Sequence, residues 1–423
     1  MDGVKYPTAG KTLIKGLGLT SLIGFVFTGG WMIGLKTQPT VILGQHSPFA
    51  APTLTKNELR EKISKLKNPN IYLFKQNEVQ LDGFDEPVIL DYAFDPSMQS
   101  MAEDLLAQYK PDLGAMVAMD ASTGRVLAMA GVNRAFEVQG HPALEATFPS
   151  ASVFKVVTAA AAIEDQKANP YTMIPYSGKD HTLYKSQIKE RLGGWRRISS
   201  LKTAFAKSIN TVFGRIGVFS VGKAPLKSFS QRFGFDETIS AEFPILPSHS
   251  ANPSDEFELA EMASGFTQHN VMTAMHGAMI AASVANDGVM MQPYFLNGAY
   301  LKSGKTIYRS EPAMMTKVML PETASEVRTL MKETVATGTS RKTFRGFFRG
   351  KFSELEVGGK TGHLTDKKSG GRIDWFVGFA QSHGRKIAVS VLTMHKKYWT
   401  VKSSYLARKA FETAFSQKKV VAR

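Results

Sequence analysis

Residues 148–163 read FPSASVFKVVTAAAAI, an apolar stretch of helical character that contains a single cation. In it, Ser152 and Lys155 form a Ser-x-x-Lys pair, and Lys155 is the only ionisable residue. A lysine becomes neutral near pH 7 only when it is desolvated or lies beside another cation. Side chains three residues apart on a helix point to the same side, so we expect Ser152 to be a nucleophile and Lys155 its base.

The Ser-x-x-Lys pattern is weak by itself, because both residue types are common. The sequence contains it six times, starting at Ser64, Ser152, Ser186, Ser199, Ser220 and Ser416. In the other five copies the lysine has polar or charged neighbours that let it keep its proton. For the copy at Ser152 an alternative also stands, in which the serine only caps the helix and the Lys155 amine extends to solvent.

Two further short motifs follow in the chain. Ser208-Ile209-Asn210 begins 56 residues after Ser152, and Lys360-Thr361-Gly362 precedes an apolar hairpin over 375–394 and is expected on an edge strand. Rival copies of the two patterns lie in predicted turns or loops at Ser250, Lys302 and Lys368. Three motifs in this order are far more specific than any one of them.

This ordered set resembles the fingerprint of the penicillin-binding transpeptidase family, which is Ser-x-x-Lys, Ser-x-Asn and Lys-Thr-Gly. Four more segments are similar to blocks of that family, namely GAMVAMDASTGRVLAMAG (114–131), LKTAFAKSINTVF (201–213), AASVANDGVMMQP (281–293) and DWFVGFA (374–380). The resemblance covers roughly 110–415. It departs at two places, since Ser150-Ala151 replace the usual Pro-Gly before the nucleophile and His363 replaces the usual Thr or Ser after Lys-Thr-Gly.

The resemblance implies a peptidoglycan D,D-transpeptidase that acts on stem peptides ending in D-alanyl-D-alanine and is acylated by β-lactams. It makes Ser152 the nucleophile and Lys155 its base. Ser208 would relay a proton to the leaving amine, and Lys360 would supply positive charge that attracts the terminal carboxylate.

The same resemblance implies substrate-binding roles for Asn210, Thr361, Gly362 and His363. Asn210 would hydrogen-bond the donor peptide and Thr361 the terminal carboxylate. The backbone N–H groups of Ser152 and His363 would form the oxyanion hole. Because His363 lacks a hydroxyl, any contact that a hydroxyl makes with the carboxylate must be replaced.

Other activities on the same fold stay open. A D,D-carboxypeptidase or a β-lactamase would share the acyl-enzyme and differ in how readily water removes it. Asn210 argues against class D β-lactamases, which carry Ser-x-Val, whereas Glu164 and Glu190 leave a water-activating glutamate open. A non-catalytic penicillin sensor or wall-binding scaffold is a further alternative.

The pattern of apolar residues predicts an α+β fold. Hairpins are expected at 115–130, turned by 121–124, and at 375–394, turned by 381–384. Helices are expected at 96–109, 153–163, 201–216, 272–285 and 403–415, and a capping box at 55–58 begins a shorter one through Lys67. Strands at both ends of the body with helices between them predict an antiparallel sheet with flanking helices and a helical subdomain, as in penicillin-binding transpeptidases and serine β-lactamases.

The N-terminal segment predicts a membrane anchor. Residues 16–35 are uncharged and long enough to cross a bilayer as one helix, and bulky residues where a cleavage site would need small ones favour an uncleaved span over a signal peptide. Lysines before the span place the N-terminus in the cytoplasm and the catalytic body in the periplasm. We expect residues 1–15 to form a tail, 16–35 a lipid-embedded anchor, and 36–109 a linker with a short stalk. The transpeptidase domain is expected over 110–417, followed by a basic tail over 418–423.

The composition excludes further kinds of chemistry and of partner. The 423 residues include no cysteine, which removes thiol nucleophiles, disulfides and iron–sulfur clusters, and the histidines lack metal-ligand spacing, so we expect no cofactor and no metal. The formal charge of +16 suits an anionic membrane or wall, but the basic residues are spread without interleaved aromatics, so no nucleic-acid partner is expected. The segment ahead of the body is too short for the glycosyltransferase domain of bifunctional relatives, and a membrane glycan polymerase is a weakly supported partner.

Overall fold

The computed structural model describes residues 53–66, 74, 76–136, 140–144, 148–189 and 196–416. Clustering of contacts divides the chain into Met1–Phe49, which lies outside the described residues, and Ala50–Arg423. The predicted anchor at 16–35 therefore lies outside the described part. Within that part, no helix is both long and apolar enough to span a membrane.

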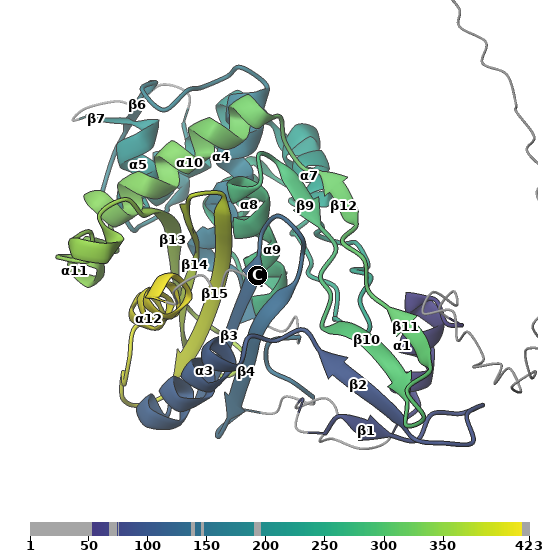
Figure 1. Cartoon of the computed structure of the whole chain (residues 1–423). Coiled ribbons are helices and arrows are strands. Elements are labelled where there is room, and N and C mark those ends of the chain that lie inside the picture. Colours follow the sequence, from purple (N-terminus) through teal and green to yellow (C-terminus); the bar gives the residue numbers. More distant parts are fainter. Residues whose placement is uncertain are drawn as a thin grey trace, which may run out of the picture. The chain divides into compact units, whose positions relative to one another are not determined.

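An antiparallel sheet of five strands forms the centre of the body (Figure 1). Its order is β13-β14-β15-β3-β4, with bounds Glu356–Thr365, Arg372–Ser382, Arg385–His395, Leu113–Asp120 and Val126–Asn133. The two predicted hairpins are confirmed, although β14 and β15 continue further than expected and leave only His383 and Gly384 as the turn. The strand β13 carries the Lys-Thr-Gly motif at one edge of the sheet, so one side of this motif is left unpaired.

Helices cover both faces of the sheet. The helices α3 (Pro96–Tyr109) and α12 (Ser403–Ser416) pack on one face, as their apolar spacing predicts. The almost wholly apolar α9 (Ala274–Ala285) packs on the other, where it lies between the sheet and the helical region. Side chains alternate between the two faces along each strand, so Phe376 belongs to the first core and Trp375 and Val377 to the second.

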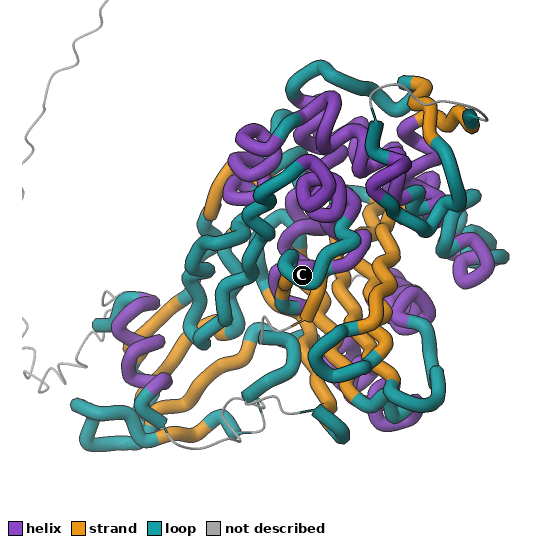
Figure 2. The backbone as a smooth tube through the Cα atoms, turned by 180° about the vertical axis from the view of Figure 1, so that it is seen from behind, coloured by secondary structure: helices purple, strands orange, loops and turns teal. Residues whose placement is uncertain are grey.

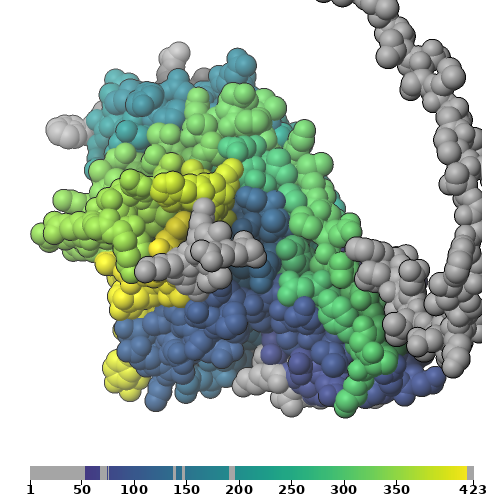
Figure 3. Space-filling view, viewed as in Figure 1, coloured from purple at the N-terminus to yellow at the C-terminus, as the bar shows by residue number. Residues whose placement is uncertain are grey.

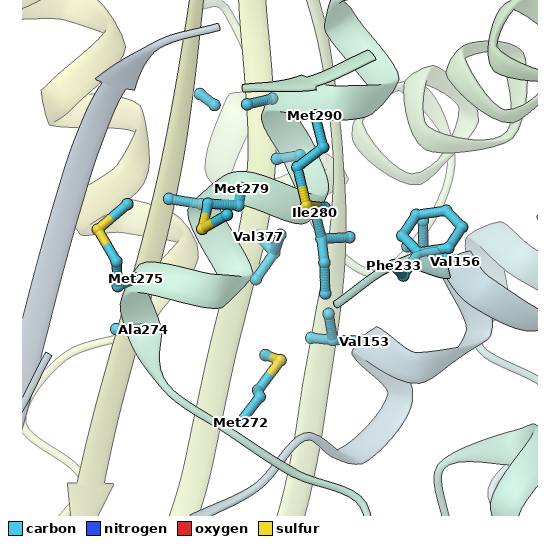
Figure 4. Packing of buried hydrophobic residues seen from close by; sticks show 14 of the residues in the cluster. Val153, Val156, Phe233, Met272, Ala274, Met275, Met279, Ile280, Met290 and Val377 are labelled. Carbon is cyan, nitrogen blue, oxygen red and sulfur yellow. The ribbon is translucent and has the colours of Figure 1, made fainter. Parts of the chain in front are cut away.

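A helical subdomain lies beyond α9. It contains α4 (Lys155–Glu164), α5 (Leu201–Lys207), α6 (Asn210–Ile216), α7 (Lys223–Arg232), α8 (Glu256–Ser264) and α10 (Pro321–Ala336), with α11 (Arg341–Phe344) following α10. Figure 4 shows how the core connects these layers: Val153 lies near Ile280 of α9, and Val156 lies beside Phe233. The segment that carries Ser152 also packs directly on β13 and β14.

The described residues also form smaller sheets (Figure 2). The largest has the order β1-β2-β10-β11, with bounds Glu78–Val79, Val88–Tyr92, Leu296–Leu301 and Thr306–Arg309, and it lies beside α1 (Lys56–Ser64). The pairs β5–β8 (Phe148–Pro149 with Val271–Met272), β6–β7 (Met173–Tyr176 with Arg197–Ser200) and β9–β12 (Val289–Met291 with Met314–Lys317) are two-stranded. The capping box at Thr55 is present, but α1 ends at Ser64 instead of Lys67.

Two helix predictions require correction. The predicted helix at 201–216 is broken into α5 and α6, because Ser208 adopts a left-handed backbone conformation at φ +59°. The predicted helix at 272–285 begins two residues later, since Met272 belongs to β8. Apolar periodicity could not reveal either boundary, because buried apolar residues continue across both of them: Phe205 and Ile209 flank Ser208, and Ala274 follows Met272.

A buried carboxylate connects the helical region to the four-stranded sheet. Glu242 is fully buried and accepts hydrogen bonds from the Phe295 backbone N–H at 3.0 Å and from the hydroxyls of Tyr308 and Ser310 at 2.7 Å each. Burial, with the nearby carboxylate, raises the pKa of Tyr308, which keeps the phenol a donor. The three donors satisfy the charge that burial would otherwise make costly.

We expect Glu242→Leu to lower the free energy of unfolding by about 3 kcal/mol, because it leaves the buried donors of Phe295 and Tyr308 without an acceptor. Glu242→Gln keeps one oxygen acceptor and should lose less. Denaturant unfolding of both variants measures the difference. Equal stability of the Leu variant and the wild type would contradict this role.

Candidate active site

The candidate nucleophile lies in a short 3-10 helix rather than at the start of an α-helix. This segment is η1 (Ala151–Phe154), and α4 begins only at Lys155. Side chains three residues apart eclipse one another in a 3-10 helix, so Ser152 and Lys155 point the same way. Lys155 Nζ lies 2.8 Å from Ser152 Oγ, which confirms the predicted contact. The contact is made from a 3-10 helix and not, as expected, from an α-helix.

The surroundings of Lys155 favour its neutral form. The residue is fully buried, and burial together with the charge of Lys360 lowers its pKa well below the usual value. Its Nζ donates to Asn210 Oδ1 at 2.8 Å and to the Ser264 carbonyl at 2.5 Å. Neither oxygen can donate a proton, so a neutral amine uses both of its N–H groups on them. Its lone pair then faces Ser152, as a base requires.

The second lysine of the site holds the second serine. The break between α5 and α6 turns Ser208 toward β13, where Lys360 Nζ donates to its hydroxyl at 3.0 Å and to the Thr361 carbonyl at 2.9 Å. Lys360 is also fully buried, and burial lowers its pKa to about 7. A lysine with that pKa carries a fraction of a positive charge at neutral pH, which accounts for its effect on Lys155.

The turn before Ser152 is strained and tightly enclosed. Ala151, which replaces the family's glycine, adopts φ +48°, a conformation that costs an L-residue roughly 1 kcal/mol. Its carbonyl lies so close to Gly265 that a Cβ on that glycine would come within 1.9 Å of the oxygen. The indole of Trp375 donates to the Pro149 carbonyl at 2.8 Å, and the Ser150 N–H donates to the Asn270 carbonyl at 2.7 Å. These contacts fix the path of the chain into the nucleophile.

A pocket of about 350 Å³ contains the three motifs. It is lined by Ser152, Ser208, Asn210, Thr361 and His363 from the predicted set. Alternation along β13 places Thr361 and His363 on one side of the strand, and the Thr361 hydroxyl lies 2.6 Å from that of Thr339. Gly362 packs against the nucleophile turn, since a Cβ there would lie 3.1 Å from the Ser150 carbonyl. The structure therefore brings all eight predicted residues to one place, with Lys155 and Lys360 buried behind the pocket.

His363 has a partner that the sequence did not reveal. Its Nε2 lies 2.7 Å from Oδ1 of Asp374, which is directly opposite on β14. Asp374 is 3% exposed, and its other oxygen accepts from the Ser403 backbone N–H at 2.7 Å. The pair fixes the imidazole ring at the edge of the pocket, where the family usually has a hydroxyl.

Sequence reasoning missed several contributors to the pocket. Thr339, Gly265, Phe266 and His181 also line it, and the Ser264 carbonyl binds Lys155. They come from loops and helix ends that carry no recognisable pattern, and a backbone carbonyl has no sequence signal at all. Trp375 lies in the DWFVGFA segment, but the segment alone does not indicate a contact with Pro149.

Residues 114–415 match the family described as the penicillin binding protein transpeptidase domain, and the chain belongs to this family. Among similar curated proteins, the peptidoglycan D,D-transpeptidase PbpA of Mycolicibacterium smegmatis is 28% identical over 337 residues, 72% of this chain and 66% of PbpA. Stage V sporulation protein D of Bacillus subtilis is 25% identical over 75% of this chain and 50% of its own length. The chain thus spans slightly less than two thirds of PbpA.

Solved structures agree on the fold. The D,D-transpeptidase domain of a peptidoglycan glycosyltransferase from Eggerthella lenta is 25% identical, with a TM-score of 0.63 over 77% of this chain and 82% of that one. An imipenem acyl-enzyme complex of penicillin-binding protein A from M. tuberculosis gives a TM-score of 0.63 at 22% identity, over 77% of this chain and 79% of that one. The predicted transpeptidase fold, a sheet with flanking helices and a helical subdomain, is therefore confirmed.

We expect Gly265→Ala to destabilise the protein through the Ala151 carbonyl. The control is Gly304→Ala, because Gly304 also has a positive φ, at +91°, but no atom within 4 Å of the added Cβ. Both variants carry the backbone penalty, and only Gly265→Ala forces the nucleophile turn to move. Its free energy of unfolding should fall by about 2 kcal/mol more than that of the control. Equal losses in denaturant unfolding would contradict the packing argument.

The depressed pKa of Lys155 predicts a pH dependence of stability. Between that pKa and the ordinary lysine value of about 10.4, the unfolded chain binds one more proton at this residue than the folded one, so this contribution makes stability rise with pH. Relative to Lys155→Met, the wild type should gain up to about 1.4 kcal/mol per pH unit within this window.

Unfolding free energies of the two proteins from pH 6 to 10 measure the effect. Lys223→Met, at an exposed lysine, is the control and should parallel the wild type. A constant difference between wild type and Lys155→Met across the range would mean that Lys155 is not held neutral.

Proposed function

We propose that this protein is a peptidoglycan D,D-transpeptidase that cross-links stem peptides through an acyl-enzyme on Ser152. The observation that carries the proposal is the placement of Lys155 Nζ, 2.8 Å from Ser152 Oγ with its N–H groups directed at two carbonyl-type oxygens. Membership in the transpeptidase family and the similarity to the peptidoglycan D,D-transpeptidase PbpA support the substrate class.

In the first step Ser152 Oγ attacks the carbonyl carbon of the penultimate D-alanine. Its proton passes to the lone pair of Lys155 as the C–O bond forms. The N–H groups of Ser152 and His363 stabilise the oxyanion of the tetrahedral intermediate. When the C–N bond breaks, Ser208 delivers a proton to the departing D-alanine amine and is resupplied from Lys360, with which it is hydrogen-bonded.

In the second step an amine of a neighbouring stem peptide attacks the ester carbon. A peptide bond forms, the bond to Ser152 Oγ breaks, and the proton lost by the amine returns to the serine oxygen through the two lysines. One D-alanine is released for each cross-link, and no cofactor takes part.

The substrate carboxylate is bound by the hydroxyls of Thr361 and Thr339, which lie 2.6 Å apart, and is attracted by Lys360. Asn210 is largely occupied by the protein, since Oδ1 accepts from Lys155 and Nδ2 donates to the His181 carbonyl at 3.0 Å. Its principal role is therefore to position Lys155, with any contact to the donor peptide secondary. Gly362 allows β13 to approach the turn before Ser152.

A hydrolytic enzyme on the same fold is the second candidate. The residues that line the 350 Å³ pocket include no carboxylate, and a class A β-lactamase needs one to activate water. Glu164 is engaged elsewhere, accepting from Arg232 at 2.6 Å and from the Leu320 N–H at 2.7 Å. Glu190 lies outside the described residues. Within the described chain, these observations favour transfer to an amine over hydrolysis.

The proposal includes the predicted location. Residues 16–35 would anchor the chain in the lipid of the inner membrane as a single span, with the body in the periplasm. The segment 36–109 would then act as linker and stalk, and a membrane glycan polymerase would be a neighbour that supplies uncross-linked strands.

We expect a fluorescent penicillin to label the wild type covalently for minutes or longer, because no carboxylate of the described residues lines the pocket to activate water against the ester at Ser152. Ser152→Ala should abolish the label. Ser186→Ala is the matched control, since Ser186 begins another Ser-x-x-Lys copy that is exposed, and it should label normally. Equal labelling of Ser152→Ala and wild type would exclude the assignment of the nucleophile.

The same chain incubated with a D-alanyl-D-alanine peptide, with and without an acceptor amine, separates the candidate functions. Amine-dependent cross-linked product indicates a transpeptidase, whereas release of D-alanine at the same rate without amine indicates a carboxypeptidase. Rapid loss of the penicillin label with release of opened drug would indicate a β-lactamase. Labelling without any reaction of the peptide would indicate a sensor.

A further inference from the structure

The contact between His363 and Asp374 fixes which nitrogen of the imidazole carries a proton. Nε2 lies 2.7 Å from Oδ1 of Asp374, and a carboxylate oxygen only accepts hydrogen bonds, so Nε2 is the nitrogen that bears hydrogen. In the neutral ring Nδ1 then has a free lone pair and cannot donate. The hydroxyl that the family usually has at this position can donate to a carboxylate. In its neutral form His363 therefore presents a base where the family presents a donor.

The same contact directs Nδ1 towards the catalytic pocket. The two nitrogens of an imidazole point in nearly opposite directions. The strand β14, which carries Asp374, flanks β13 on one side, and the other side of β13 is the edge of the sheet, where η1 packs and the pocket lies. With Nε2 directed at β14, the lone pair of Nδ1 faces the pocket side of the strand. Within the described chain Nδ1 has no hydrogen-bond partner of its own.

Asp374 is itself held by the start of α12. Its second oxygen accepts from the Ser403 N–H at 2.7 Å, and the Ser403 hydroxyl donates to the Asp374 carbonyl at 2.6 Å. The helix α12 packs on β14 and β15 and against α11, and Figure 3 shows the surfaces of α12 and of the α11 segment adjoining. The ring of Trp399 lies 5.9 Å from that of His363, between centroids. A buried carboxylate thus orients the imidazole, as it does for the histidine base of a Ser-His-Asp triad.

This imidazole lies beside the atoms that react in the second step. Gly362 packs so closely on the nucleophile turn that an added Cβ would lie 3.3 Å from the Ser152 nitrogen, and His363 is the next residue of β13. Thr361, two residues earlier along the same strand, is proposed to bind the carboxylate of the departing D-alanine. An acceptor amine approaches the ester from the place that the leaving amine vacates, because its attack reverses the departure step. That place adjoins His363.

We propose that His363, positioned by Asp374, is the base that removes the extra proton from the acceptor ammonium before it attacks the acyl-enzyme. This inference rests on the proposed function. An amine of a stem peptide is mostly an ammonium at neutral pH and has no lone pair, so it must first lose a proton. The two lysines of the site are buried and already hydrogen-bonded to the two serines. The imidazole, which is 48% exposed, is therefore the base that an ammonium arriving from solvent meets first.

The protons of the second step then balance. Nδ1 takes one proton from the ammonium, which becomes a neutral amine, and the imidazolium is stabilised by the Asp374 carboxylate until it releases that proton to water. The amine nitrogen forms a bond to the ester carbon, and the bond from that carbon to Ser152 Oγ breaks. A further proton of the nitrogen passes to Ser152 Oγ through the two lysines, as in the proposed reaction. His363 and Asp374 end in their starting states.

A second imidazole, that of His181, also lines the catalytic pocket. Among the described residues its ring has no carboxylate partner, so no contact selects its tautomer or directs a lone pair. Other charged groups near His363 line the neighbouring hollow of about 610 Å³, and none of them lines the described walls of the catalytic pocket. These groups are Glu261, His269, Lys367 and Arg372.

The test is a competition between two acceptors for one acyl-enzyme. The full chain is incubated at about pH 7 with a D-alanyl-D-alanine donor peptide, D-methionine, whose α-amine is an ammonium, and hydroxylamine, which is largely uncharged and needs no base. Mass spectrometry measures the ratio of the D-methionine product to the hydroxamate. Because both products arise from the same acyl-enzyme, any change in the acylation rate cancels in this ratio.

We expect His363→Gln to lower the ratio by about a hundredfold, a size typical of general base catalysis. Asp374→Asn should lower it by a similar factor, because the amide keeps an oxygen for the Ser403 N–H and turns its NH2 group to Nε2, which moves the ring proton to Nδ1. The double variant should lose no more than either single variant, since both changes remove the same base. Asp366→Asn, at a buried carboxylate in the turn between β13 and β14, is the control and should leave the ratio unchanged.

An unchanged ratio in His363→Gln would overturn the inference, and this variant at an exposed side chain decides the question if Asp374→Asn does not fold. D-methioninamide, an ammonium without a carboxylate, should show the same loss as D-methionine. A loss confined to D-methionine would mean that His363 only binds the acceptor carboxylate, and the inference would be wrong.

Two other outcomes also count against the inference. An equal loss in His181→Gln would assign the base to the other ring, and a wild type that forms only hydroxamate would show that no ammonium is activated. A wild type that forms neither product would instead contradict the proposed function. Both products in the wild type, with an unchanged ratio in the variants, would leave the proposed function intact and exclude His363 as this base.

Discussion

The burial of Lys155 is the constraint on which the rest of the site depends. An ammonium group in this position would lose its hydration and would find neutral oxygens as hydrogen-bond acceptors, namely Asn210 Oδ1, the Ser264 carbonyl and Ser152 Oγ. The neutral amine needs just two acceptors and one hydroxyl. Its third neighbour is Ser152 Oγ, so the same desolvation that makes the lysine a base also directs its lone pair at the nucleophile.

The contacts that hold Lys155 against Ser152 lower the stability of the fold locally, and packing elsewhere compensates for this cost. Ala151 has a left-handed backbone conformation, and two lysines, Lys155 and Lys360, are buried in the same region. The compensation is packing: Val153 and Val156 are fully buried in the core, and Trp375 donates a hydrogen bond to the Pro149 carbonyl from the sheet. The sheet therefore supports the strained turn, since β13 and β14 pack directly against η1.

The sequence was sufficient to predict the parts of the fold and of the site that follow from apolar periodicity and from the order of the motifs. The hairpins, the flanking helices and the eight residues around Ser152 were predicted, because each of them belongs to a pattern that is visible in the sequence. The 3-10 geometry at Ser152 and the break at Ser208 were not, since buried apolar residues continue through both places, Val153 and Phe154 at one and Phe205 and Ile209 at the other. Asp374 was in a quoted segment, but its contact with His363 depends on the register of β13 against β14, which sequence alone does not give. The anchor at 16–35 stays a prediction.

One chain of hydrogen bonds joins the edge of the catalytic pocket to the start of α12. His363 at the edge of the pocket is held by Asp374, and Asp374 is bonded to the first residue of α12, since Ser403 donates its N–H to the carboxylate at 2.7 Å and its hydroxyl to the Asp374 carbonyl at 2.6 Å. The loop that ends at Ser403 carries Trp399, whose ring lies 5.9 Å from that of His363, between centroids. The departure from the family at His363 is thus more than the loss of one hydroxyl. A ring in this place shares a carboxylate with the start of α12, so a movement of the loop before α12 would reach β13 through a single buried side chain.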